Sequence, residues 1–73
     1  METKFDSMLR LLVIRKQQRT ICIRTQHILA YQYRSDIDFT KIWVAHIEDP
    51  FELEGDHRKV LAEAMLYEHA SHA

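Results

Sequence analysis

The sequence predicts a mainly α domain, a small bundle of three or four short helices, on the basis of two observations. The 73 residues contain one glycine, one proline and no asparagine, whereas two-residue β-hairpin loops favour glycine and asparagine because their central residues need positive φ angles. Apolar residues also recur in three segments at the i, i+3, i+4, i+7 spacing of one helix face. Scarce turn residues and helical spacing together favour helices joined by polar connections.

The first helix is expected over residues 4–17. Thr3 stands before it and Asp6 follows three residues later, a pair that can cap the first helical turn. The apolar face of this helix would consist of Phe5, Met8, Leu9, Leu12 and Val13.

Segment 19–34 is compatible with two interpretations. Its odd positions alternate in the manner of a strand, and β-branched residues favour that state. A helical stripe is also present, and we expect a second helix here because an unpaired strand cannot stand alone. The alternative is an α+β fold with a small sheet formed by residues 19–34 and 39–47.

A third helix is expected over residues 36–48, since Pro50 disfavours a helical conformation in the residue before it. Its apolar stripe includes Phe39, Trp43 and Ile47. We expect these three side chains to anchor the core or an interface.

The fourth helix is expected over residues 57–70. Asp56 directly follows Gly55 and is a favourable N-cap residue. Apolar side chains on one face then support the helical assignment, namely Val60, Leu61, Ala64 and Met65.

Length and composition indicate a single small domain, residues 1–73, of marginal stability. A chain this short buries only about 60 % of its unfolded surface, so oligomerisation often supplements its core. The only cysteine is Cys22, which excludes an intrachain disulfide and favours a reducing compartment, the cytoplasm. The net charge is +5 over residues 1–34 and −6 over residues 35–73, which suggests that the two halves pair, within one chain or between two.

The run Ile47-Glu48-Asp49-Pro50-Phe51-Glu52, with Ile21-Cys22-Ile23-Arg24-Thr25 upstream, carries a family resemblance over residues 19–59. It resembles the central, PAP-associated domain of the noncanonical poly(A) polymerases and terminal uridylyltransferases. The resemblance implies that Asp49 and Glu52 read a nucleotide base, and Arg24 is then a candidate for contact with a phosphate. The histidine that the family places three residues after the second Glu is not matched, because Gly55 stands there.

A complete catalytic or metal site is not expected. Asp36 and Asp38 resemble the metal-binding aspartate pair of nucleotidyltransferases, but a helix N-terminus explains both residues, and the upstream Gly-Ser pair is missing. His69 and His72 have no cysteine or carboxylate partner at a familiar zinc spacing. We therefore predict no enzyme activity for the chain alone, at most a fragment or degenerate copy of a nucleotidyltransferase, with no cofactor and no metal.

The predicted function is that of a non-catalytic interaction module, of the adaptor or inhibitor kind, which forms a homodimer or docks on a larger protein. The reason is a surplus of apolar side chains over what so small a core can bury. The alternative is a nucleotide- or RNA-binding piece related to the central domain of the terminal uridylyltransferases and poly(A) polymerases. The basic run Arg15-Lys16-Gln17-Gln18-Arg19 could in addition contact a phosphate backbone. No membrane partner is expected, since the longest apolar run is far shorter than the roughly 18 residues that a span requires.

Overall fold

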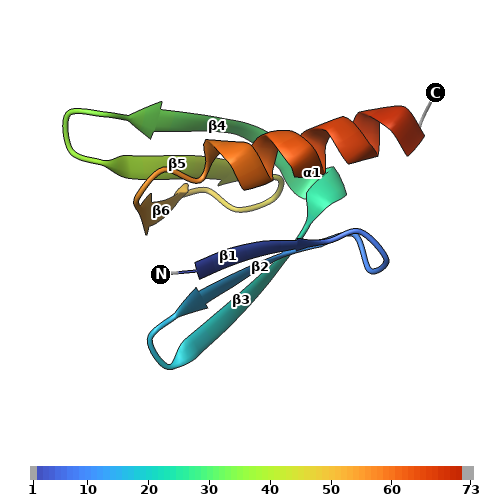
Figure 1. Ribbon diagram of the computed structural model, residues 1–73, viewed down its shortest axis with the longest axis horizontal. Helices are drawn as coiled ribbons and strands as arrows, with labels where there is room; N and C mark the ends of the chain where they lie inside the picture. Colours follow the sequence, from blue (N-terminus) through green and yellow to red (C-terminus); the bar gives the residue numbers. More distant parts are fainter. Residues whose placement is uncertain (1, 72–73) are drawn as a thin grey trace.

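Two antiparallel three-stranded sheets and a C-terminal helix make up the computed structural model, which describes residues 2–71 (Figure 1). The first sheet contains β1 (Glu2–Asp6), β2 (Leu11–Lys16) and β3 (Arg19–Arg24) in that order. Burial alternates along β2, where Leu12 and Ile14 are fully buried and their neighbours are not. This alternation is the pattern of a sheet with one face on the core and the other toward solvent.

The second sheet contains β4 (Ile28–Arg34), β5 (Phe39–Val44) and β6 (Phe51–Glu54), again in chain order. A bulge near the start of β4 shifts its register against β5 and leaves Leu29 65 % exposed. A short 3₁₀ helix, Thr25–His27, joins the two sheets.

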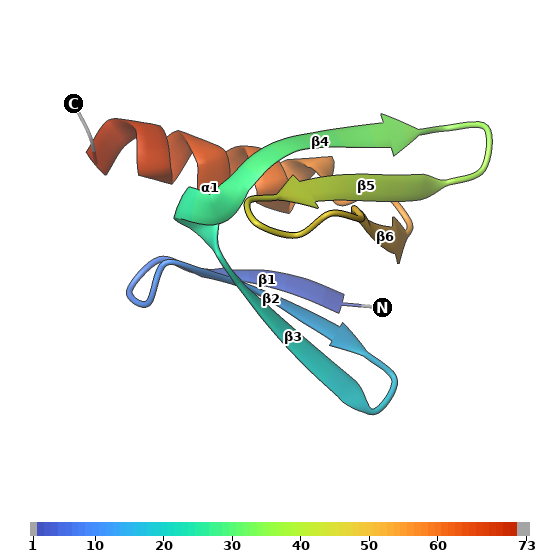
Figure 2. The same cartoon turned by 180° about the vertical axis from the view of Figure 1, so that it is seen from behind.

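The helix α1 (Arg58–Ser71) confirms the helix predicted over residues 57–70. The carboxylate of Asp56 accepts a hydrogen bond from the backbone N–H of Arg58, the first helical residue, at 3.0 Å. The helix packs against β1, β4 and the 3₁₀ helix, and so covers one side of the two sheets. Figure 2 shows β3 as the strand of the first sheet farthest from α1.

The core lies between the inner faces of the two sheets and under the helix. Cross-strand partners such as Leu12 and Ile23 face it together. Its buried apolar residues are Leu12, Ile14, Ile23, Ile28, Ile42, Val44, Leu53, Leu61 and Ala64.

The predicted helical bundle is wrong, because the structure is mainly β with one helix. Residues 4–17 form a hairpin, 19–34 contribute two strands and 36–48 contain β5. The glycine argument failed because other residues make the turns: Arg10, Gln17, Asp38 and His46 have φ angles of 54°, 52°, 54° and 67°. Such a conformation costs a non-glycine residue about 1–2 kcal/mol, a cost that sheet formation can offset.

The strand alternative for the middle of the chain describes the structure better. β4 pairs antiparallel with β5, so residues 28–34 and 39–44 do form a sheet. Residues 19–24, however, belong to the other sheet, where β3 pairs with β2. The apolar spacing of residues 11–16 predicts a helix, and this prediction excludes the strand β2 with which β3 in fact pairs.

Candidate functional site

The strands β3 and β6 are the open edges of the two sheets. Sheet order places each at one end of its sheet, and no other strand within residues 2–71 pairs with its outer side. The opposite edges, β1 and β4, lie against α1. An exposed edge presents unpaired backbone N–H and C=O groups, which can pair with a strand of another chain.

A groove of about 470 Å³ separates these two open edges. Its apolar lining contains Ile21 of β3 with Phe51 and Leu53 of β6. Ile21 and Phe51 are half-buried and pack against the core cluster, whereas Leu53 is only 2 % exposed. The groove is therefore a continuation of the core that stays open to solvent.

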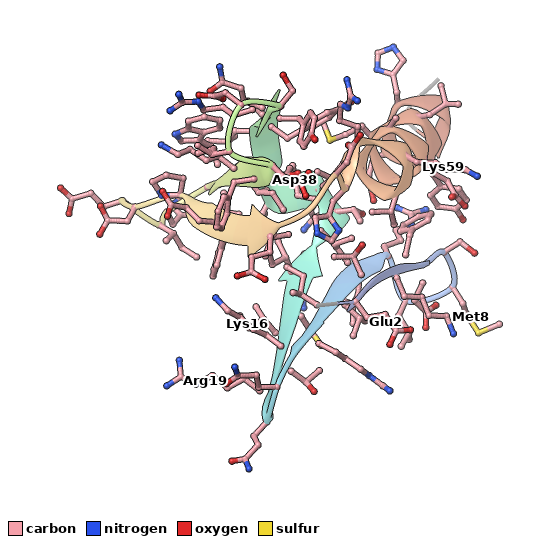
Figure 3. All side chains as sticks on the ribbon, turned by 60° about the vertical axis from the view of Figure 1, so that its left-hand side comes forward. Glu2, Met8, Lys16, Arg19, Asp38 and Lys59 are labelled. Carbon is pink, nitrogen blue, oxygen red and sulfur yellow. The ribbon has the colours of Figure 1, made fainter. Side chains whose placement is uncertain are left out.

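The rim of the groove is charged, with opposite signs on its two sides. Lys16 stands on the side of the first sheet, and Asp49 and Glu52 stand on the side of the second. Lys16 and Arg19 are direct cross-strand partners, and both are exposed. Figure 3 shows both side chains leaving the β2–β3 hairpin on the same side. Like charges directly opposite each other destabilise a sheet, so this pair does not contribute to the stability of the hairpin.

The ladder pattern shows which backbone groups of β3 face outward. The N–H of Thr25 donates to the carbonyl of Arg10, which makes this a hydrogen-bonded pair. Because such pairs alternate along an antiparallel ladder, the backbone groups of Thr20, Cys22 and Arg24 point away from β2. The outer edge of β3 thus offers three residues for pairing with an incoming strand.

The same pattern shows that β6 offers less. The N–H of Gly55 donates to the carbonyl of Asp38, so Glu52 and Glu54 are the outward-facing residues of β6. The carbonyl of Glu54 lies 2.6 Å from Nε2 of His57 and is already engaged. Strand pairing at the groove is therefore better served by β3.

The three residues predicted to bind a nucleotide are divided between two places. Asp49 and Glu52 both border the groove. Arg24 lies at the far end of β3 and lines a separate pocket of about 350 Å³, together with Arg10 and Glu68. The structure does not bring Arg24 into one site with Asp49 and Glu52.

The predicted anchors lie away from the groove. Phe39 and Trp43 are half-buried on β5, on the face opposite to buried Ile42. Ile47 follows β5 in a connection and is 47 % exposed. The sequence placed these three on one helical stripe, whereas the strand carries Phe39 and Trp43 outward and leaves Ile47 beyond its end.

Asp36 and Asp38 lie in the exposed turn between β4 and β5, so their predicted place at a helix N-terminus is wrong. The Arg34 guanidinium hydrogen-bonds Asp36 and lowers the pKa of its carboxyl. Asp38 accepts a hydrogen bond of 2.7 Å from the hydroxyl of Tyr33, which raises the pKa of that phenol. Each carboxylate thus has its own partner in the turn.

His57 is a buried histidine that ties the two sheets together. Nδ1 lies 2.9 Å from the hydroxyl of Thr3 on β1, and Nε2 lies 2.6 Å from the carbonyl of Glu54 on β6. A carbonyl oxygen only accepts, so Nε2 carries the hydrogen. Both ring nitrogens are therefore engaged in contacts between the two sheets. His69 lies on α1, while His72 lies outside the described residues.

Within residues 2–71, no group of three or more histidine, cysteine, aspartate or glutamate side chains is placed to hold a metal ion. No helix in this part of the chain combines the length and the apolar character needed to cross a membrane. The groove is the feature that the sequence analysis missed. The alternation of Ile21 and Ile23 in the sequence indicated a strand at this place. Only folding, however, brings Ile21 and Phe51 to the same groove.

Comparison with protein-family models, curated proteins and solved structures found no match to the chain.

Proposed function

We propose that the chain is a non-catalytic protein-binding module that captures an extended segment of a partner protein along the groove between β3 and β6. The observation that carries the proposal is that two sheet edges, which no strand within residues 2–71 pairs, border one groove with an apolar lining. Strand addition at such an edge gains affinity from main-chain hydrogen bonds and specificity from alternate side chains. An adaptor or inhibitor would work in this way.

The groove favours a partner segment of defined chemistry. A strand added to β3 would pair with the backbone of Thr20, Cys22 and Arg24. Its inward side chains would meet Ile21 and Phe51, which favours apolar residues there. Arg24 and Arg19 lie at the two ends of β3, so acidic residues at the ends of the segment would add charge complementarity. We therefore propose an acidic, alternately apolar segment as the ligand.

A single proline substitution tests this mode of binding. The N–H of Cys22 faces away from β2, so Cys22→Pro removes a donor for the partner without removing a hydrogen bond of the sheet. Cys22→Ser is the matched control, because it keeps the N–H. Peptides of twelve residues selected from a random display library on the wild-type chain serve as probes, with their affinity measured by fluorescence anisotropy.

We expect Cys22→Pro to weaken binding at least about tenfold, which corresponds to about 1.4 kcal/mol, and Cys22→Ser to leave it unchanged. Circular dichroism of both variants confirms that the fold persists. Equal affinity of the two folded variants, or failure of the library to yield acidic, apolar-patterned binders, would contradict capture at β3.

Nucleotide or RNA binding is a second candidate, supported by Lys16, which lines the groove together with Asp49 and Glu52 and has Arg19 as its cross-strand partner. NMR titration with UTP, ATP and a short single-stranded RNA discriminates between the two. Shifts with nucleotide at residues 47–59 and at Lys16 and Arg19 would favour this candidate, whereas the protein-binding proposal expects no response. We place the protein-binding function in the cytoplasm, because the single cysteine suits a reducing compartment.

A further inference from the structure

We infer that a second copy of the chain fills the groove when no other partner is bound, with β3 of each copy pairing with β6 of the other. The inference rests on the proposed function, because it uses the same outer edge of β3. It names a second copy of the chain as one ligand of the groove, and it implies that this copy competes with a partner segment for the groove.

Charge separation between the sheets is the first argument. Residues 2–24, which form the first sheet, contain six basic and two acidic residues, a net charge of +4. Residues 28–54, which form the second sheet, contain two basic and six acidic residues, a net charge of −4. Three ion pairs, Arg34–Asp36, Lys41–Glu52 and Arg58–Asp56, lie within residues 34–58, so none of them bridges the two sheets.

The edges that border the groove carry these same opposite signs. β3 begins with Arg19 and ends with Arg24, whereas β6 carries Glu52 and Glu54 on its outward-facing positions. Two β3 edges would place arginines near one another, an arrangement that natural edge strands use to prevent like pairing. Pairing of β3 with the β6 of another copy instead brings arginine and glutamate together.

The arrangement of the strands is compatible with a closed dimer. β3 and β6 border the same groove. Their directions are roughly opposed in Figures 1 and 2, and Figure 3 shows that the two strands also cross at a steep angle. A twofold axis beside the groove, midway between the direction of β3 and the reverse of the direction of β6, would set β3 beside the partner copy's β6. At the second seam it would set β6 beside the partner copy's β3. Each sheet would continue into the other sheet of the partner copy, with both inner faces on one core. The two seams are equivalent, so association stops at two copies rather than continuing into a fibre.

Such a dimer removes the features that are exposed in the single chain. The half-buried side chains of Ile21 and Phe51 become covered at both seams. The outward backbone groups of Cys22 can pair with both outward groups of Glu52, or with Glu54, whose carbonyl would then be shared with His57. Because the partner segment and the second copy need the same edge, raising the protein concentration should lower the apparent affinity for the peptide.

Disulfide trapping tests the proposed seam. Cys22 is exposed on the outer face of β3, and in the dimer Glu52 and Glu54 of β6 lie on the continuous outer face beside it. Cα atoms of a hydrogen-bonded antiparallel pair are about 5.5 Å apart, which suits a disulfide. Glu52→Cys and Glu54→Cys are therefore each combined with the native Cys22. Glu63→Cys, exposed on α1, is the matched control.

Mild oxidation of Glu52→Cys or Glu54→Cys should give a species with the mass of two chains on non-reducing electrophoresis. We expect this disulfide-linked dimer to form at least about tenfold faster than in the Glu63→Cys control. Equal rates in all three variants would overturn the inference. Sedimentation equilibrium supplies the independent measurement. We expect Arg24→Glu to weaken dimerisation about tenfold and the double variant with Glu52→Arg to restore it, as coupled charges do. A wild-type monomer at about 0.5 mM would also overturn it.

The outcomes separate this inference from the proposed function. A monomer whose β3 edge binds selected peptides would remove the dimer and retain peptide capture. A trapped dimer that binds no peptide in the library would retain the dimer and remove the capture of other partners.

Discussion

Thr40 provides the sharpest test of how the fold is held together. Its side chain is completely buried on β5, and its hydroxyl donates to the carbonyl of Gly55 at 2.7 Å while accepting from the N–H of His57 at 3.2 Å. Thr40→Val keeps the shape of the side chain and removes both hydrogen bonds. The variant therefore isolates the contribution of one hydroxyl to the connection between β5 and the start of α1.

The expected loss can be worked out from these two contacts. The N–H of His57 is buried, and a buried donor left without a partner costs about 1–3 kcal/mol. Loss of the bond to the partly buried carbonyl of Gly55 adds about 1 kcal/mol. The added methyl group returns about 0.8 kcal/mol. We expect a net loss of about 2 kcal/mol, or a fall in Tm of about 8–16 °C for a domain of this size.

Urea unfolding followed by circular dichroism, at one fixed protein concentration, measures this loss. Thr20→Val is the matched control, because Thr20 is exposed on β3 and such surface changes stay within about 0.5 kcal/mol. Thr40→Ser keeps the hydroxyl and should retain more stability than Thr40→Val. Equal unfolding free energies for Thr40→Val and Thr20→Val would refute the reasoning.

Three further predictions concern other parts of the structure. Gly55→Ala should lower the stability of the fold by about 1–2 kcal/mol, because Gly55 has a φ angle of +93°. The added Cβ would lie 3.6 Å from Nε2 of His57, an ordinary contact distance, so the loss comes from the backbone and can be measured by thermal melting. Hydrogen bonds from Arg58 lower the pKa of Asp56 to about 2, so this carboxylate stabilises the fold above its unfolded pKa near 4. The free energy of unfolding should then fall between about pH 4 and pH 2, and this fall should be smaller in Asp56→Asn. Identical acid-unfolding curves for the wild type and Asp56→Asn would argue against a stabilising Asp56–Arg58 pair. Trp43→Ala should leave the chain folded and cost less stability than Leu12→Ala, because Leu12 is fully buried and Trp43 only partly. Leu12→Ala is expected to cost about 2–5 kcal/mol, and denaturant unfolding of both variants compares the losses.

The first segment shows why helical spacing was misleading. Phe5 and Leu12 are seven residues apart, which places them on one face of a helix. They are also direct partners across the β1–β2 hairpin, where both face inward. A short hairpin can therefore reproduce the spacing of a helix, and only the pairing of the strands distinguishes the two. Asp6, expected in a helix cap, instead accepts hydrogen bonds from the N–H groups of Met8 and Leu9 in the turn.

The third segment failed for a related reason. The stripe of Phe39, Ile42 and Trp43 is continuous on a helix, but on β5 Ile42 faces the core while the two aromatic residues face outward. The last segment succeeded because its start is marked locally. Gly55 supplies a positive φ angle and the Asp56 carboxylate receives the first helical N–H, so the boundary needs no distant partner.

Local chemistry thus let the sequence alone determine the position of α1, the exclusion of an intrachain disulfide and the separation of positive from negative charge along the chain. Only the tertiary structure decided where those charges and the apolar residues meet. Ile21 and Phe51 are thirty residues apart, and nothing near either residue specifies that β3 and β6 border one groove. The two strands meet because the inner faces of both sheets are buried in one core, while α1 lies against β1 and β4 on the side away from the groove. These contacts join residues that are far apart in the sequence, so no short stretch of sequence specifies them.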